Sequence, residues 1–193
     1  MPVLTADNDD RAAIAAMLAR AFADDPAMSF ILPDRATRLK QLPRLFALFF
    51  DEDAHGMRLV TRGGEAATFW RPPGRARTKT LDILLHALPL LGIFGANLVR
   101  ALSVSNAVEA HFPPGAYWYL HIAGCDPAAQ GRGFGGGAVR AGLERIAGSG
   151  LPAYLETATE RNVGFYRGLG FELTGEWSVP KNGPRFWSMM RTA

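Results

Sequence analysis

The sequence predicts one domain of the α+β class. Its 193 residues, of which 48% are hydrophobic, are enough to bury a substantial core and fall within the size range of a single domain. Apolar residues recur at helical spacing in several segments, whereas two short runs joined by Gly63-Gly64 are typical of a β-hairpin. No internal repeat or low-complexity linker divides the chain, so we expect a single domain over residues 1–193.

Two helices are predicted in the first 50 residues. Asp7 is the expected N-cap of the first helix, and Asp24-Asp25-Pro26 is expected to stop it. The second helix is predicted over residues 39–50, with a bend at Pro43. The apolar stripes expected to face the core are Ile14, Met17, Leu18, Ala21 and Phe22 in the first helix, and Leu42, Leu45, Phe46 and Phe49 in the second.

The hairpin is predicted to consist of strands at residues 58–62 and 65–70, and Pro72-Pro73-Gly74 closes it. The largely apolar segment 81–102 follows. Seven polar, Gly or Pro residues interrupt this segment, whereas a membrane span needs about 20 apolar residues in succession. We therefore expect a pair of core helices hinged at Pro89 and Gly92, or a functional variant in which they wall a binding pocket.

Strands and helices alternate in the rest of the chain. The pattern predicts a strand at 117–125, a helix from the next glycines to about residue 147, a strand at 153–157, a short helix at 162–169 capped by Gly170, and final strands near 171–178 and 185–191.

A glycine-rich loop lies where the helix after the first of these strands begins. It consists of Gln130, Gly131, Arg132, Gly133, Phe134 and Gly135. Residues without Cβ let a backbone approach a ligand closely, and the first N–H groups of a helix attract anions. Because Arg132 adds a cation, the loop is a candidate pyrophosphate site; the alternative is a flexible surface loop.

The same letters also satisfy a dinucleotide-binding pattern. Gly131, Gly133 and Gly136 match GxGxxG, and Glu156 follows 20 residues after Gly136. That fold places its first glycine directly after a strand, whereas five residues, 126–130, intervene here. Only 37 residues follow Glu156, too few for further βα units. The placement therefore argues against a dinucleotide.

The C-terminal third resembles the GNAT superfamily of acetyl-coenzyme A dependent N-acetyltransferases. The resemblance covers about a third of the chain and rests on Trp118-Tyr119-Leu120, Cys125-Asp126-Pro127, the 130–135 loop, Tyr154-Leu155-Glu156-Thr157, Asn162, Phe165-Tyr166 and Leu169-Gly170-Phe171. Within the superfamily, Arg161-Asn162-Val163, Val179-Pro180, Gly183-Pro184-Arg185 and Trp187 are most similar to the puromycin N-acetyltransferase type. The resemblance implies a mixed, mostly antiparallel central sheet flanked by helices, and acetyl-coenzyme A as cosubstrate.

The resemblance also implies site residues. Tyr166 lies where the pattern places a phenol near the cofactor sulfur, so it is the candidate general acid; the alternative is a packing aromatic beside Phe165. Asn162 matches the asparagine that binds the pantetheine arm, although an N-cap would also suit it. Ala123 and Cys125 lie where the strand backbone pairs with pantetheine amides, and the 130–135 loop would hold the pyrophosphate.

Glu156 is the first candidate for the base that accepts the ammonium proton. It is equally suited to pair with Arg161 or to cap a loop. His121 is a second candidate, with a partly buried histidine bonded to backbone as its alternative, and water is a third. Strand alternation predicts one face with Tyr119, His121, Ala123 and Cys125, and another with Trp118, Leu120, Ile122 and Gly124.

A covalent or metal-dependent mechanism is not expected. Cys125 and His121 are four residues apart on one strand, or about 13 Å, too far for a dyad or a zinc pair. Cys125 is therefore expected to be a small core residue, and no cluster has metal-ligand spacing. Acidic residues at 24, 25 and 51–53 are expected either to attract a cationic amine or to solvate helix ends.

The composition fits a cytoplasmic enzyme. The net charge of +3 and pI near 9.3 suit an anionic cofactor, but no basic run indicates nucleic acid. One cysteine excludes an intrachain disulfide, and we expect no secretory signal and no membrane partner. The predicted activity is direct acetyl transfer to a primary amine of a small molecule, by a monomer or homodimer. The alternatives are a non-catalytic coenzyme A sensor and a peptide or protein acetyltransferase.

Overall fold

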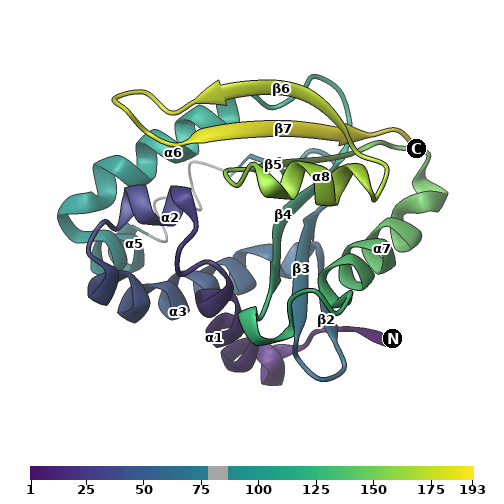
Figure 1. Cartoon of the computed structure of the whole chain (residues 1–193), viewed down its shortest axis with the longest axis horizontal. Coiled ribbons are helices and arrows are strands. Elements are labelled where there is room, and N and C mark those ends of the chain that lie inside the picture. The colour runs from purple at the N-terminus through teal and green to yellow at the C-terminus, as the bar shows by residue number, and fades with distance from the viewer. Residues whose placement is uncertain (78–86) are drawn as a thin grey trace.

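The chain forms one seven-stranded sheet with the order β1-β2-β3-β4-β5-β7-β6 (Figure 1). The computed structural model describes residues 1–77 and 87–193. Its strands are β1 (Val3–Thr5), β2 (Met57–Thr61), β3 (Ala66–Arg71), β4 (Trp118–Cys125), β5 (Ala153–Thr157), β6 (Glu172–Ser178) and β7 (Arg185–Arg191). Of the paired strands only β4 and β5 are parallel. The predicted mixed, mostly antiparallel sheet is therefore confirmed, and the doubly wound dinucleotide fold is excluded.

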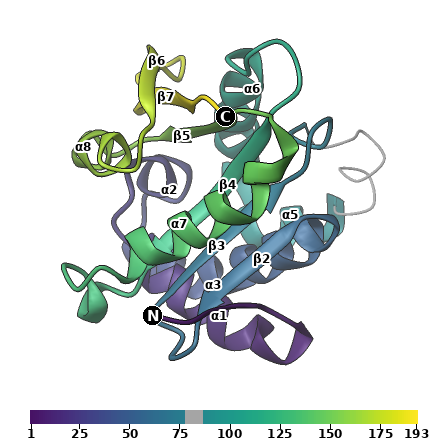
Figure 2. The same cartoon turned by 90° about the vertical axis from the view of Figure 1, so that its right-hand side faces the viewer.

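Helices cover both faces of this sheet. On one side lie α1 (Arg11–Ala21), α2 (Pro26–Ile31), α3 (Arg35–Glu52), α5 (Ala87–Phe94) and α6 (Leu98–Ala110), and on the other lie α7 (Phe134–Ile146) and α8 (Arg161–Arg167). Figure 2 shows α7 crossing the face of β3 and β4 opposite α1 and α3. Short 3₁₀ turns lie at Asn8–Asp10, Asp53–His55, Gly95–Asn97, Pro127–Ala129 and Ala147–Ser149.

The predicted start of the first helix is confirmed, but the second helix was missed. Asp7 caps a 3₁₀ turn that leads into α1, in a capping box with Asp10. Asp25 and Pro26 do not merely stop α1. The Asp25 carboxylate accepts bonds from the N–H groups of Ala27 and Met28, at 2.9 and 3.0 Å, and Pro26 takes the first position of α2. The Asp-Pro pair thus starts a helix here. Proline is tolerated at the first position because the backbone N–H that it lacks would have no partner inside the helix.

Other boundaries shift for similar reasons. The helix predicted at 39–50 begins four residues earlier, since Asp34 caps it through the N–H of Thr37 at 2.8 Å. The hairpin is confirmed as β2 and β3, which pair antiparallel. Strand β1 was not predicted, because three residues are too few to show alternation; its place is set by pairing with β2.

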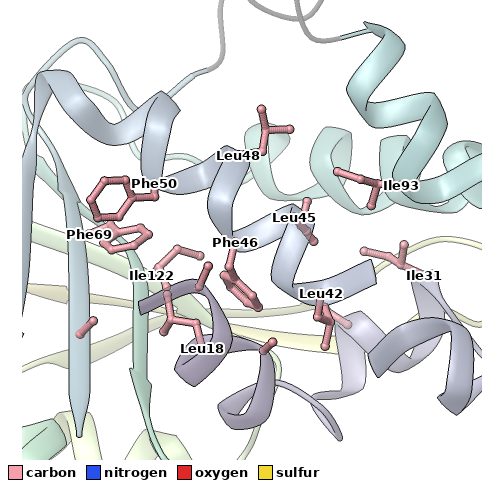
Figure 3. Close-up of a cluster of buried hydrophobic side chains, with 14 of the residues drawn as sticks. Leu18, Ile31, Leu42, Leu45, Phe46, Leu48, Phe50, Phe69, Ile93 and Ile122 are labelled. Atoms are coloured by element: carbon pink, nitrogen blue, oxygen red, sulfur yellow. The ribbon is translucent and has the colours of Figure 1, made fainter. Parts of the chain in front are cut away.

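The core between the sheet and the N-terminal helices is built from fully buried aromatic and aliphatic residues (Figure 3). Leu18, Phe46 and Phe69 are 0% exposed. Helix α1 approaches β4 so closely that a Cβ on Gly124 would lie 2.4 Å from Leu18 Cδ2. Glycine at this position therefore fixes how near α1 lies to the strand.

The apolar segment after the hairpin is only partly as predicted. Residues 81–86 lie outside the described residues, and residues 87–110 form α5 and α6. The break lies at Gly95, where φ is +51°, and not at Pro89 or Gly92. The pair contacts α2 and α3 and buries Ile93, Phe94, Val104 and Ala107 in the core, but Leu88, Leu91, Val99 and Leu102 are exposed, so only one face of the pair belongs to the core. Ala87–Ala110 passes a length and hydropathy test for a membrane span, with a mean hydropathy of 1.6.

A bulge in β4 makes the predicted division of its faces wrong in part. Phe69 of β3 pairs with Ile122 and Trp70 pairs with Leu120, so His121 is left without an opposite residue. Leu120 packs with Trp70 and Val139 on the α7 side, whereas Ile122 packs with the N-terminal helices. The extra residue shifts the alternation by one, because strand period is two.

Candidate functional site

Strands β4 and β5 separate after two residue pairs. Trp118 pairs with Ala153 and Tyr119 with Tyr154, and no further pair joins the strands (Figure 1). From Leu120 to the end of β4, the edge that would face β5 therefore has backbone N–H and C=O groups without a sheet partner. Ala123 and Cys125 lie on this open edge. A ligand with amide groups, such as pantetheine, fits this edge by strand-like hydrogen bonding.

The glycine-rich loop lies just beyond the open edge, at the start of α7. Gly131 and Gly133 have φ of +75° and +85°, and a Cβ on either would meet no atom within 4 Å. Gln130 Nε2 donates to the carbonyl of Cys125 at 3.4 Å, which ties the loop to β4. Arg132 is exposed beside Phe134. The loop thus offers helix N–H groups and the exposed Arg132 cation, which fits a pyrophosphate.

The structure adds a reason for glycine at position 133. Its φ of +85° is in the left-handed region, which disfavours any branched residue. We expect Gly133→Val to raise the Kd for coenzyme A at least about tenfold, because the loop would leave the conformation that aims its N–H groups at the ligand. Calorimetric titration measures this. Gly148→Val is the control, since Gly148 lies in the turn after α7 with open space and no positive φ. Equal affinities for both variants would contradict the loop as the anion site.

A cavity of about 300 Å³ lies beside the open edge of β4. It brings together five of the residues singled out in the sequence, namely His121, Ala123, Glu156, Asn162 and Tyr166. The 130–135 loop and Cys125 do not line this cavity. They lie close to it, because Gly135 faces both Cys125 and the Phe165 ring next to Tyr166.

Glu156 is a buried carboxylate with an unused oxygen. It lies on β5, and its Oε1 is buried without a hydrogen-bond partner among the described residues. Burial raises the pKa of Glu156 to about 8, although the nearby Tyr154 and Tyr119 side chains oppose the shift. No salt bridge among the described residues joins Glu156 to Arg161, so the predicted alternative of an ion pair between them is not supported. A carboxylate with this pKa suits proton transfer near neutral pH.

Tyr166 and Asn162 lie on α8, next to the end of β5. Tyr166 is buried, and its hydroxyl has no hydrogen bond within the described part of the chain. Burial raises the pKa of Tyr166 further above its ordinary value, so the hydroxyl keeps its proton at neutral pH. Asn162 donates from Nδ2 to Thr157 Oγ1 at 3.3 Å. It is the second residue of α8 and not the N-cap, which is Glu160.

His121 belongs to a buried charge cluster that sequence reasoning missed. Its Nδ1 lies 2.6 Å from Asp53 Oδ2, and Asp53 Oδ1 accepts from Arg71 Nε at 2.5 Å. Because a carboxylate only accepts, Nδ1 carries the proton and Nε2 is left as the acceptor. Burial and the Arg71 charge lower the pKa of His121, against the effect of Asp53. No sequence spacing indicates this cluster, because its members are 18 and 68 residues apart.

The acidic residues at 24, 25 and 51–53 lie in different surroundings, and their predicted roles stay predictions. Asp24 and Asp51 form exposed ion pairs with arginines, whereas Asp25 and Glu52 line the cavity. Cys125 is half-buried, and burial raises the pKa of its thiol, which does not favour a nucleophile. Within residues 1–77 and 87–193, no group of three or more His, Cys, Asp or Glu residues is placed to hold a metal ion.

Known proteins share this arrangement. Residues 91–171 match the model of the acetyltransferase (GNAT) family. A mycothiol acetyltransferase of Nocardioides sp. (strain ATCC BAA-499 / JS614) is 44% identical over 55 residues, which are 27% of this chain and 19% of that relative. The chain therefore spans about a fifth of that curated relative. The more specific resemblance to puromycin N-acetyltransferases stays a prediction, because this relative is of another type.

Solved structures match over the whole length. One, of histone acetyltransferase HPA2 and related acetyltransferase from Corynebacterium glutamicum ATCC 13032, has a TM-score of 0.76 at 25% identity, over 99% of this chain and 96% of that one. Arylalkylamine N-acetyltransferase 2 from Aedes aegypti has a TM-score of 0.60 at 12% identity, over 99% and 98%, which indicates a shared fold. GNAT acetyltransferases use acetyl-coenzyme A. The family match over residues 91–171 and the full-length structural similarity together show that this chain has the fold of GNAT acetyltransferases and resembles them in sequence over part of its length.

Proposed function

We propose that the enzyme transfers the acetyl group of acetyl-coenzyme A directly to a primary amine of a small molecule. The observation that carries this proposal is the buried Oε1 of Glu156, which has no partner among the described residues and lies in a cavity that Tyr166 also lines. A cavity of about 300 Å³ is at the lower end of the range for small-molecule sites, which favours a small acceptor over a protein.

Glu156 acts as the base. Acetyl-coenzyme A supplies, when bound, a thioester whose carbonyl carbon forms a C–N bond with the amine as its C–S bond breaks. A neutral amine is required, so the ammonium first loses a proton to the Glu156 carboxylate, directly or through water. His121, with Nε2 as acceptor, is the alternative base at the same cavity. The two are distinguished by the pH dependence given in the Discussion.

Tyr166 acts as the acid. The leaving thiolate needs a proton, and the Tyr166 hydroxyl holds one that no described residue engages. Asn162, the backbone of Ala123 and Cys125, and the loop Gln130 to Gly135 would hold the cofactor. The open edge of β4 and the 130–135 loop at the start of α7 support this assignment. The edge suits the amide groups of the pantetheine arm, and the loop next to it suits the pyrophosphate at the end of that arm.

Parallel titrations and a turnover assay test the proposal. We expect calorimetry to detect binding of coenzyme A and acetyl-coenzyme A but not of NADH, and thiol release to depend on added amine. Binding without release for any amine would favour a coenzyme A sensor instead. Failure to bind either form of coenzyme A would remove the basis of the proposal.

A further inference from the structure

We propose that the acceptor is a primary monoamine, with one ammonium group on an apolar body and no second positive charge. This inference rests on the proposed function, because it names the acceptor class for the same cavity. Three features of the cavity carry it: an apolar end, a single unpartnered carboxylate oxygen, and an arginine in the wall.

Helices α2, α5 and α6 supply an end of the cavity whose lining is largely apolar and includes Met28, Ile31, Leu90, Phe94, Leu98 and Val104. Ser105 and Glu109 of α6 also line the cavity. Ile31, Phe94 and Val104 are each at most 8% exposed, so the lining is part of the packed structure. An alkyl or aryl body is stabilised here because its apolar surface leaves water. A charged group at the same place would lose its hydration without a partner.

The carboxylates that line the cavity offer one place for an ammonium group. Asp25 already accepts two backbone N–H bonds, and Glu52 lies 3.4 Å from Arg71 Nη2. Glu109 lies 3.9 Å from an Arg77 nitrogen. Among the described residues only Glu156 has a buried side-chain oxygen without a partner. An ammonium group at Glu156 would therefore donate the hydrogen bond that its buried Oε1 lacks.

Arg71 already pairs with the carboxylates beside it. It lines the cavity and is bound to Asp53 and Glu52, with a side chain that is 10% exposed. A diamine that reaches Glu156 with one end would bring its other ammonium either to carboxylates that Arg71 already engages or among apolar side chains. Both placements are unfavourable, because a buried charge without a partner is strongly destabilised.

Matched amines test this inference in the wild-type protein. Hexylamine and 1,6-diaminohexane have the same chain length and differ only in the second ammonium, and 2-phenylethylamine adds an aromatic body. We expect kcat/KM, measured by thiol release, to be at least about tenfold higher for the monoamines than for the diamine or for a short peptide with a free N-terminus.

Two variants at neighbouring positions test whether the apolar lining of the cavity causes the preference for monoamines over diamines. Leu98 lines the cavity, whereas Val99 is 71% exposed on the same helix. Leu98→Glu supplies a carboxylate at the apolar end, so it is expected to raise the ratio of kcat/KM for 1,6-diaminohexane to that for hexylamine by about tenfold or more. Val99→Glu adds the same charge outside and is expected to leave the ratio unchanged.

The outcomes separate this inference from the proposed function. If the wild type acetylates the diamine or the peptide as well as hexylamine, the inference is wrong but the acetyltransferase proposal stands. If acetyl-coenzyme A binds and no monoamine is acetylated, the inference is again wrong. If acetyl-coenzyme A does not bind at all, the proposed function itself fails. Preference for monoamines that Leu98→Glu reduces and Val99→Glu preserves supports the inference.

Discussion

Glu156→Gln is expected to lower kcat/KM for the amine by about 10² to 10⁴-fold, the usual loss for a positioned general base. The amide keeps the shape of the carboxylate but cannot accept the ammonium proton. Affinity for acetyl-coenzyme A is expected to be unchanged, because Glu156 lies on β5 and not in the glycine-rich loop. Steady-state thiol release measures the first quantity, and calorimetry measures the second.

The pH profile decides between Glu156 and His121. The pKa of Glu156 is about 8, so kcat/KM for the wild type is expected to rise with pH through an inflection near 8 as the carboxylate loses its proton. The pKa of His121 lies below its ordinary value, so a histidine base would place the inflection below that of free histidine. Glu156→Gln should remove the inflection near 8. A full inflection that persists in the variant would assign the base to another group.

The Tm of Glu156→Gln shows whether any loss of its activity is due to unfolding. The pKa of Glu156 is higher in the folded state than in the unfolded chain, where a glutamate has its ordinary value of 4.5. The folded state therefore binds this proton more tightly, and the carboxylate destabilises the fold progressively as pH rises from about 4.5 to 8. Glutamine carries no such charge. Above pH 8 we expect the Tm of Glu156→Gln to equal or exceed that of the wild type, so lost activity would not reflect unfolding. Glu160→Gln, at the exposed start of α8, is the matched control for the loss of a carboxylate.

The sequence predicts the C-terminal third well because its signals are local. The glycine loop, the strand at 153–157 and the short helix before Gly170 each carry their own boundary residues, and the structure places them within a few residues of the prediction. The cavity collects Glu156, Asn162 and Tyr166 because β5 leads directly into α8. Glu156, Asn162 and Tyr166 are therefore close together in the site because they are close together in the sequence.

The parts that failed depend on distant partners. The bulge at His121 exists only in the pairing of β4 with β3, and no feature of the β4 sequence alone reveals it. The ion pairs that join Asp53 to Arg71 and His121 connect the end of α3 with two strands. The hinge between α5 and α6 lies at Gly95, where φ is positive. The sequence offers Pro89, Gly92 and Gly95 as possible hinges, and residue type alone does not tell which of them bends the chain. Tertiary packing decides each of these features.

Tyr166→Phe is expected to lower kcat by about 10²-fold or more, as for the loss of a positioned acid, with little change in the Kd for acetyl-coenzyme A. The structural alternative, that Tyr166 only packs beside Phe165, predicts a different result. The ring contacts with Phe165 and Phe171, at 5.0 and 5.8 Å between centroids, survive in the variant. Because the hydroxyl has no partner among the described residues, its removal leaves no described donor or acceptor unsatisfied, and Tm is expected to be unchanged.

Tyr117→Phe provides the matched control. Tyr117 is 8% exposed, similar to the 6% of Tyr166, but it lies outside the cavity lining. Its variant also loses one phenol hydroxyl from a buried tyrosine and is expected to keep the wild-type kcat. If Tyr166→Phe turns over as fast as Tyr117→Phe, then water and not Tyr166 protonates the thiolate. If kcat falls only for Tyr166→Phe, and a leaving group that needs no proton restores the rate, the phenol is the acid, because a purely structural role would not depend on the basicity of the leaving group.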